Sequence, residues 1–290
     1  MRRSGLVTAV LLAASGLVVP GGAAHARSAA KTEVVASFYP LTFVAQRVGG
    51  DRVEVTNLTP AGAEPHDLEL STKQIDNVLD ADLVLVLGHN FQPAVEKAAA
   101  ARDGPTLKLL DRLASANDPH VWLDPVLMRA IVTRVQRALT KADPSGRAVY
   151  RRNADVLRGE LDAFDARFRT GLAHCARRVF ITAHEAFGYL ARRYRLRQEG
   201  AAGLSPDAEP DARHLAELAD LVKREHVTVV FTESLVSPRI ADTLAREAGV
   251  RTAVLDPLEG LTPAAQKAGA TYFTVMGENL RQLRGALACT

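Results

Sequence analysis

Cysteine is scarce in this sequence: its 290 residues contain only Cys175 and Cys289. The C-x-x-C spacing of cysteine metal sites is therefore absent, and we expect no lipid-modified cysteine at the N-terminus. In an exported protein two cysteines most simply form one disulfide, and two unpaired thiols are the alternative. Such a disulfide would close a long loop, for which the loop-entropy model allows at most about 4–5 kcal/mol of stabilisation.

Long apolar runs are also missing after the N-terminal stretch. That stretch combines two arginines with a short apolar run at 6–19 and the small-residue pattern "AHA" at 24–26. This combination is typical of a cleaved signal peptide, and an uncleaved anchor is disfavoured because the apolar run is short for a bilayer span. We therefore predict a signal peptide at 1–26 and an exported mature chain that begins at Arg27.

An excess of charge of one sign is the third feature that the sequence lacks. The full chain has 36 basic and 33 acidic residues, a formal net charge of +3. Removal of the predicted signal peptide takes away two arginines and no acids, which leaves 34 basic and 33 acidic residues and a charge of +1. A nearly neutral chain argues against a nucleic-acid partner.

Short apolar runs rich in β-branched residues alternate with amphipathic stretches along the rest of the chain. This alternation is typical of βαβ units with parallel sheets. The expected strands lie at 33–40, 52–60, 81–88 and 105–110 in the first half and at 177–184, 196–200, 227–233 and 251–257 in the second. The expected helices lie at 41–49, 71–79, 91–101, 186–194, 211–225, 237–248 and 270–287, and one more begins at Pro125.

A long helical pattern connects the two halves. Apolar residues recur at helical spacing from Val149 to Leu172, and Asp143 followed by Pro144 is a typical helix start. A helix from 144 to about 173 would be roughly 45 Å long. The sequence therefore predicts an α/β protein of two lobes, each a parallel sheet flanked by helices, joined by one long rigid helix. The predicted boundaries are 27–142 for the N-terminal lobe, 143–174 for the connecting helix and 175–290 for the C-terminal lobe.

Three histidines stand where open α/β sheets bind ligands, next to the carboxyl ends of strands. They are His66 in "EPHDLEL", His120 in "DPHVWLDP" and His184 in "ITAHEAFG". Asp256, in "VLDPLEG", follows the last expected strand in the same way. Three imidazoles and one carboxylate suit Zn²⁺, whereas Mn²⁺ prefers more oxygens. The spacing alone leaves an alternative open, in which the histidines are ordinary hydrogen-bonded residues and Asp256 belongs to a turn.

The motifs, taken in order, resemble those of the metal-specific solute-binding proteins of ABC importers, which capture zinc or manganese outside the inner membrane. The resemblance covers essentially the whole mature chain, and "EPHDLELS" followed by "DPHVWLDP" is its most specific part. It implies that His66, His120 and His184 bind the ion and that Asp256 is the fourth ligand, a place that water or another carboxylate takes in some zinc members. The third position is glutamate in manganese binders and histidine in zinc binders, so His184 indicates Zn(II).

The resemblance also implies a function and its surroundings. We expect extracytoplasmic capture of Zn(II) and its delivery to the membrane permease of an ABC transporter, by a monomer that a zinc chaperone can load. The expected location is the periplasm or the extracellular face of the cell membrane. The resemblance implies a disulfide between Cys175 and Cys289 that ties the last helix to the second lobe. One departure is that the segment before His120 lacks the histidine-rich loop of many zinc members.

Two other functions are weighed against this one: a manganese-binding homologue and a secreted zinc-dependent hydrolase. A metalloprotease helix needs H-E-x-x-H, but His184-Glu185 is followed by Ala-Phe-Gly and not by a second histidine. Catalytic zinc keeps an open position for water, which four protein ligands would fill. A role as adhesin would not need converging ligands. We therefore expect a carrier and not an enzyme.

Overall fold

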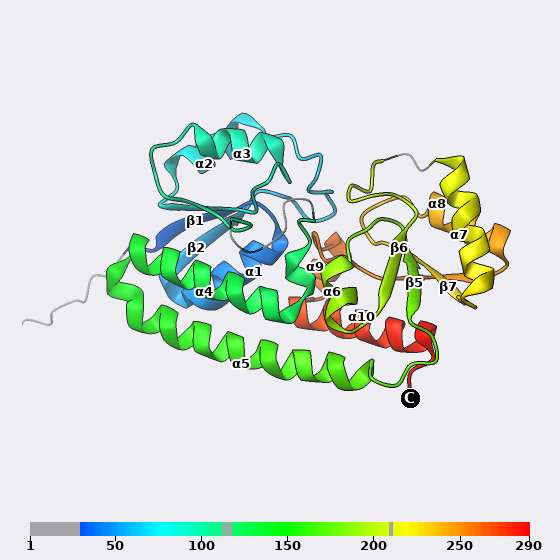
Figure 1. Cartoon of the computed structure of the whole chain (residues 1–290). Helices are drawn as coiled ribbons and strands as arrows, with labels where there is room; N and C mark the ends of the chain where they lie inside the picture. The colour runs from blue at the N-terminus through cyan, green and yellow to red at the C-terminus, as the bar shows by residue number, and fades with distance from the viewer. Residues whose placement is uncertain (1–29, 112, 114–117, 209–210) are drawn as a thin grey trace, which may run out of the picture. The chain divides into compact units, whose positions relative to one another are not determined.

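The computed structural model describes residues 30–111, 113, 118–208 and 211–290. The predicted signal peptide lies outside the described residues. Residues 31–290 form one unit, and this unit contains two four-stranded sheets (Figure 1). None of the helices in the described part of the chain combines the length and the apolar character that a bilayer span requires.

The first sheet is wholly parallel, with the strand order β2-β1-β3-β4. Its strands are β1 (Thr32–Ala36), β2 (Val53–Asn57), β3 (Leu83–Val86) and β4 (Thr106–Lys108). All four residues of the central strand β3 are buried, as expected for a strand that is covered on both faces. The connections contain α1 (Tyr39–Gly49), the 3₁₀ turn η1 (Gly50–Arg52), α2 (Thr72–Asp80) and α3 (Pro93–Ala100).

The second sheet repeats this topology, with the strand order β6-β5-β7-β8, again all parallel. Its strands are β5 (Val179–Thr182), β6 (Arg197–Gly200), β7 (Val229–Thr232) and β8 (Arg251–Val254), and its connecting helices are α6 (Gly188–Arg193), α7 (Ala212–Arg224) and α8 (Arg239–Ala248). All eight predicted strands are confirmed. In each sheet the carboxyl ends of the strands meet at one edge, so the loops that follow them gather there.

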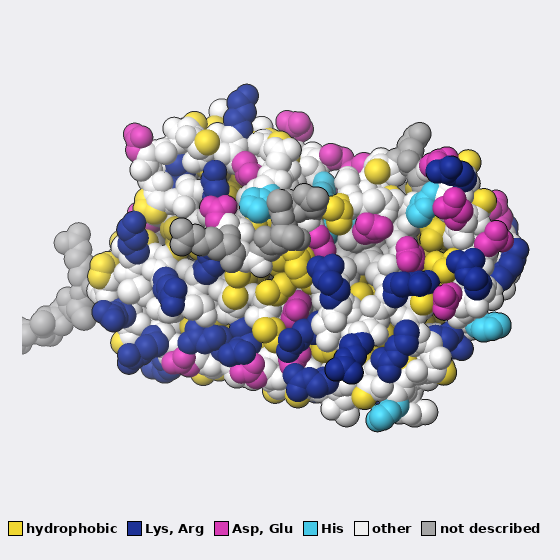
Figure 2. All heavy atoms as spheres, in the orientation of Figure 1, with side chains coloured by type: hydrophobic (Ala, Val, Ile, Leu, Met, Phe, Trp, Pro, Cys, Tyr) yellow, Lys and Arg dark blue, Asp and Glu magenta, His cyan; other side chains and the backbone are white. Residues whose placement is uncertain are grey.

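Two long helices link the halves. The helix α4 (Pro125–Ala142) follows the 3₁₀ turn η2 (Val121–Leu123), and α5 (Arg147–Gly171) lies alongside α4 (Figure 1). The predicted connecting helix is confirmed, but its first three residues form the tighter turn η3 (Pro144–Gly146). The reason is Asp143, whose carboxylate accepts hydrogen bonds from Gly146 N and Tyr150 Oη. Figure 2 shows Lys and Arg side chains gathered along the α4 and α5 edge of the face in view.

The C-terminal part contains α9 (Pro263–Lys267), which was not predicted, and α10 (Tyr272–Leu287), which was. At the start of α10, Phe273 packs edge-on against Phe43 of α1 and Phe164 of α5. The last helix therefore contacts the first half of the chain as well as the second. The predicted domain boundaries remain predictions, because one hydrophobic cluster includes residues of both halves.

A disulfide joins Cys175 to Cys289, as predicted. It connects the segment before β5 to the end of α10, and main-chain hydrogen bonds from Ala176 N to Ala288 O and from Arg177 N to Leu287 O flank it. The chain end is thus fixed to the second half by covalent and non-covalent contacts together.

Candidate metal centre

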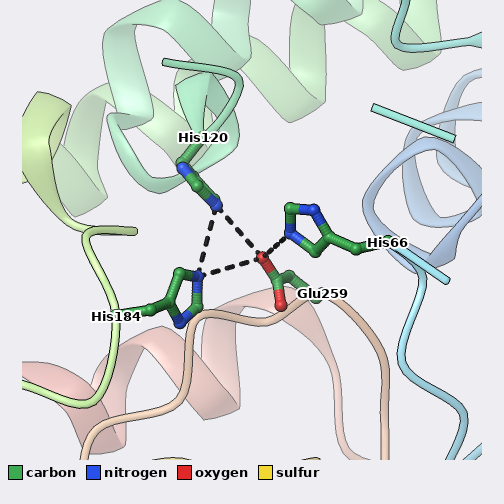
Figure 3. Close-up of side chains that lie close together, drawn as sticks. All are labelled: His66, His120, His184 and Glu259. Atoms are coloured by element: carbon green, nitrogen blue, oxygen red, sulfur yellow. Dashed lines mark hydrogen bonds and ion pairs between the residues drawn. The ribbon is translucent and has the colours of Figure 1, made fainter. Parts of the chain in front are cut away.

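Four loops, two from each half, converge at one centre (Figure 3). Each loop lies after a strand in the chain. The four residues that these loops place at the centre are His66 (after β2), His120 (after β4), His184 (after β5) and Glu259 (after β8). One donor atom from each of these residues lies within 4.8 Å of the other three. The parallel strands explain the convergence, because their carboxyl ends share one edge of each sheet.

Four of the six separations between the donor atoms match those that a tetrahedral ion requires. Oε1 of Glu259 lies 3.2 Å from Nε2 of His66, 3.2 Å from Nε2 of His120 and 3.5 Å from Nε2 of His184. The Nε2 atoms of His120 and His184 are 3.4 Å apart. Zinc–nitrogen bonds of about 2.0–2.1 Å in a tetrahedron would separate neighbouring donors by about 3.3 Å. The four residues therefore fit a tetrahedral zinc ion with little rearrangement.

Two carboxylates outside this group orient two of the histidines. Nδ1 of His120 lies 3.0 Å from Oδ1 of Asp118, and Nδ1 of His184 lies 2.7 and 2.8 Å from the two carboxylate oxygens of Glu233. The same carboxylates accept the main-chain N–H groups of the two histidines. An Nδ1–H that is donated to a carboxylate leaves the Nε2 lone pair free for a metal ion.

His66 is held differently. Its main-chain N–H donates to Oε1 of Glu64 at 3.1 Å, and its ring packs edge-on against Phe91 with the ring centroids 4.5 Å apart. Its side chain keeps 12% exposure, whereas His120 and His184 are completely buried. His66 is therefore the histidine of the group that faces the outside.

Contacts between the loops preserve the arrangement. Gly62 N donates to Leu261 O at 2.9 Å, which joins the His66 loop to the Glu259 loop. Gly62 has a φ of +86°, and a Cβ there would lie 3.1 Å from Cδ of Pro263, so a larger residue would be strained. Trp122 Nε1 donates to Pro257 O at 2.8 Å and joins the His120 segment to the same loop. The loops from the two halves are thus fastened to each other as well as to their own sheets.

The electrostatics of the centre depend on burial and on the paired charges. Burial lowers the pKa of His184, but hydrogen bonds to Glu233 and Glu259 outweigh burial and raise this pKa to about 10. The pKa of His120 is raised for the same kind of reason, through Asp118 and Glu259. Without a metal ion the His184 imidazole is protonated at neutral pH, so a binding cation has to displace its proton.

The pKa values of the carboxyl groups of Glu259 and Glu64 are shifted in opposite directions. Burial raises the pKa of Glu259, but its three histidine partners outweigh burial and hold this pKa well below its usual range. Burial and the charge of Glu259 raise the pKa of Glu64 to about 8. Glu259 is therefore ionised, whereas the protonated form of Glu64 is favoured at neutral pH.

The structure brings His66, His120 and His184 together but leaves Asp256, the predicted fourth ligand, outside the group. The Asp256 carboxylate accepts hydrogen bonds from the Ser234 hydroxyl and, at 2.7 Å, from Leu258 N. Asp256 thus forms the turn that was the alternative interpretation of this motif, and the chain passes through Leu258, with a φ of +56°, before Glu259 faces the histidines. The sequence signal for Glu259 is a second carboxylate in "LDPLEG". The ligand roles of all these residues remain predictions.

The fold and this centre together define a class: two-lobe α/β proteins in which loops from both lobes build one histidine-rich centre. Residues 34–286 match the model of the family described as zinc-uptake complex component A, periplasmic (ZnuA), and the chain belongs to this family. The chain is 35% identical over 301 residues to the high-affinity zinc uptake system protein ZnuA of Bacillus subtilis, covering 96% of this chain and 94% of that protein.

Streptococcal proteins are similar as well. The chain is 35% identical over 277 residues to the zinc-binding lipoprotein AdcA of Streptococcus pneumoniae, covering 88% of this chain and 55% of AdcA, so it spans about half of that relative. The crystal structure of the Zn(II)-bound ZnuA-like domain of AdcA superposes with a TM-score of 0.77 at 36% identity, covering 89% of this chain and 99% of that domain. This similarity extends over the whole two-lobe unit.

Proposed function

We propose that this protein captures Zn(II) outside the cytoplasm with His66, His120, His184 and Glu259 and delivers it to the membrane permease of an ABC importer. The observation that carries the proposal is the set of donor separations, 3.2 to 3.5 Å, around a point that all four side chains face. The relatives named for zinc uptake and zinc binding support the same cargo.

The donor types favour zinc over manganese. Three imidazole nitrogens and one carboxylate oxygen are ligands that Zn²⁺ takes readily, whereas Mn²⁺ prefers a site richer in oxygen. The carboxylates of Asp118 and Glu233 add support because they fix the rings of His120 and His184 in the tautomer that binds metal through Nε2. We infer that a manganese-specific role is the weaker alternative.

The arrangement suits a carrier and not a hydrolase. Four protein donors fill a tetrahedral shell, whereas catalytic zinc keeps one position open for a water molecule. The ion enters a centre in which His120, His184 and Glu259 are buried, so binding removes it from solvent. Release to a permease then requires that the loops of the two halves separate, with His66 as the most exposed ligand.

The proposed cellular location follows from the proposed function. We propose that the protein is exported and acts as a monomer in the periplasm or on the outer face of the cell membrane, where a zinc chaperone can load it. The disulfide between Cys175 and Cys289 suits an oxidising compartment of this kind.

The test is metal analysis of the purified protein together with a ligand variant. Equilibrium dialysis against zinc should give one ion per chain for the natural protein and less than one, with a much weaker dissociation constant, for His184→Ala. His214→Ala is a matched control, because His214 lies on α7 and contacts Gly200 O outside the centre. Full zinc binding by His184→Ala, or no binding by the natural protein, would overturn the proposal.

A further inference from the structure

The short helix α6 connects two histidines of the candidate metal centre that belong to different halves of the chain. It begins shortly after His184, and its residues contact Asp118, two positions before His120. Oδ1 of Asp118 accepts hydrogen bonds from Nδ1 and from the main-chain N–H of His120, both at 3.0 Å. The other carboxylate oxygen, Oδ2, faces α6. Asp118 therefore lies between the His120 ring and the helix that follows His184.

Two side chains of α6 hold Asp118 in this place. The hydroxyl group of Tyr189 donates a hydrogen bond to the main-chain oxygen of Asp118 at 3.2 Å. Nη2 of Arg192 lies 3.7 Å from Oδ2 of Asp118, and the guanidinium group of Arg192 lies 4.5 Å from the centroid of the Tyr189 ring. Arg192 is 63% exposed, so its ion pair contributes little by itself. The Tyr189 hydrogen bond is therefore the stronger of the two restraints.

Gly188 is the point at which α6 approaches Asp118 most closely. A Cβ atom at Gly188 would lie 2.8 Å from Oδ2 of Asp118, which is shorter than a non-bonded contact between carbon and oxygen allows. The backbone of Gly188 is outside the left-handed region, so its conformation does not require glycine. The close approach to Asp118 therefore explains why a residue without a side chain stands here, and any larger residue would displace the carboxylate.

The other end of α6 is anchored on the connecting helix α5. Asp165 of α5 is 4% exposed, and its two carboxylate oxygens accept hydrogen bonds from Nε and Nη2 of Arg193 at 2.9 and 3.1 Å. The Tyr194 hydroxyl group donates to the same carboxylate at 3.1 Å. Paired hydrogen bonds between arginine and a carboxylate fix both distance and direction. The helix α6 is thus a firm support against which Asp118 is held.

We propose that α6 sets the position of His120 relative to His184, and that Gly188 and Tyr189 are positioning residues that act through Asp118. The Nε2 atoms of the two histidines are 3.4 Å apart. Displacement of the Asp118 carboxylate removes the acceptor of Nδ1 of His120, and the ring is then free to turn and to carry Nε2 away from the ion. This inference rests on the proposed function and adds to it two residues that touch no ion.

The experiment compares the natural protein with Gly188→Ala and Tyr189→Phe. Gly277→Ala is the matched control, because Gly277 lies in α10 and a Cβ atom there would have open space around it. Zinc dissociation constants are measured by competition with a chromophoric chelator. Cobalt(II) is a second probe, because its visible absorption depends on the arrangement of its ligands. The melting temperature of each metal-free protein shows whether folding is affected.

We expect Gly188→Ala to raise the zinc dissociation constant about tenfold or more, as for loss of a group that supports a metal ligand, and to shift the cobalt bands. Its melting temperature without metal should stay close to that of the natural protein, because alanine favours a helix and only the end of the Asp118 side chain has to move. Tyr189→Phe should act in the same direction by a smaller factor, and Gly277→Ala should change neither binding nor bands.

Unchanged cobalt bands in folded Gly188→Ala would overturn the inference even if zinc binding weakens, because a merely structural role does not alter the geometry around the bound ion. If Gly188→Ala does not fold, Tyr189→Phe decides in the same way, since it removes only a hydroxyl group. Failure of the proposed function is distinguishable, because the natural protein itself would then bind no zinc.

Discussion

Zinc binding should release protons at neutral pH, and the structure gives their approximate number. The pKa of His184 is raised to about 10 in the metal-free protein, so at pH 7.5 this ring carries a proton that zinc has to displace. We therefore expect at least about one proton to be released for each zinc ion that binds.

The sign of the pH dependence follows from these shifts. The raised pKa of His184 stabilises the folded, metal-free protein. This stabilisation is fully present at pH values below about 6.5, the ordinary pKa of histidine, and is lost as the pH rises towards 10. Zinc competes with the bound proton, so its affinity should increase about tenfold per pH unit for each proton released, across pH 6.5 to 9. The pH dependence of the zinc affinity therefore extends well above pH 6.5, where it would end if the histidine pKa were not shifted.

The assay is isothermal titration calorimetry of zinc binding in buffers that have different ionisation enthalpies, at several pH values. The slope of the observed enthalpy against the buffer enthalpy gives the number of protons released. Glu233→Gln should reduce this number at pH 7.5, because it removes the hydrogen bond and the charge that raise the pKa of His184 most. An affinity that is constant from pH 6.5 to 9, or a zero proton count, would refute the reasoning.

Three further predictions concern other parts of the molecule. His184→Glu should shift the metal preference from zinc towards manganese, because it replaces a nitrogen donor by oxygen; parallel zinc and manganese titrations would show an unchanged preference if this is wrong. Denatured, unreduced protein should contain no free thiol, and reduction should lower the free energy of unfolding by at most about 4–5 kcal/mol; two reactive thiols in exported protein would contradict the Cys175–Cys289 pairing. Because α5 is a continuous helix, zinc should change the radius of gyration little and should concentrate hydrogen-exchange protection in the ligand loops, so a large compaction in small-angle scattering would show a hinge.

Most of the fold could be predicted from periodicity, because most strands lie in short apolar runs, with the polar β6 as an exception, and each long helix has one apolar face. The short α9 was missed, although Thr262 followed by Pro263 is a typical helix start, since five residues are too few to show a period. The tight turn at the start of the connecting helix was missed as well. It depends on the hydrogen bonds that Asp143 accepts, which alternation of apolar residues does not reveal.

The candidate metal centre could be predicted only in part, because the strand topology places the histidines but not the carboxylates. His66, His120 and His184 stand at strand ends, where topology alone brings them to one edge. Glu259 was missed because the position nearest the strand end belongs to Asp256, and only the local turn decides which of the two carboxylates faces the histidines. Asp118 and Glu233 were not found either, since a carboxylate that orients a histidine ring is recognised from the folded contact and not from its place in the sequence.

Neither half of the chain supplies more than two of the four donors, which gives the bound ion a mechanical role. His66 and Glu259 are 193 positions apart, so an ion held by both would act as a reversible crosslink, closing a longer loop than the disulfide, whose cysteines are 114 positions apart. Crosslinks of this kind restrict the unfolded chain and oppose the local opening that proteases need. The loaded protein would therefore outlast the empty one in a protease-rich environment, and its lifetime would depend on the supply of its own cargo.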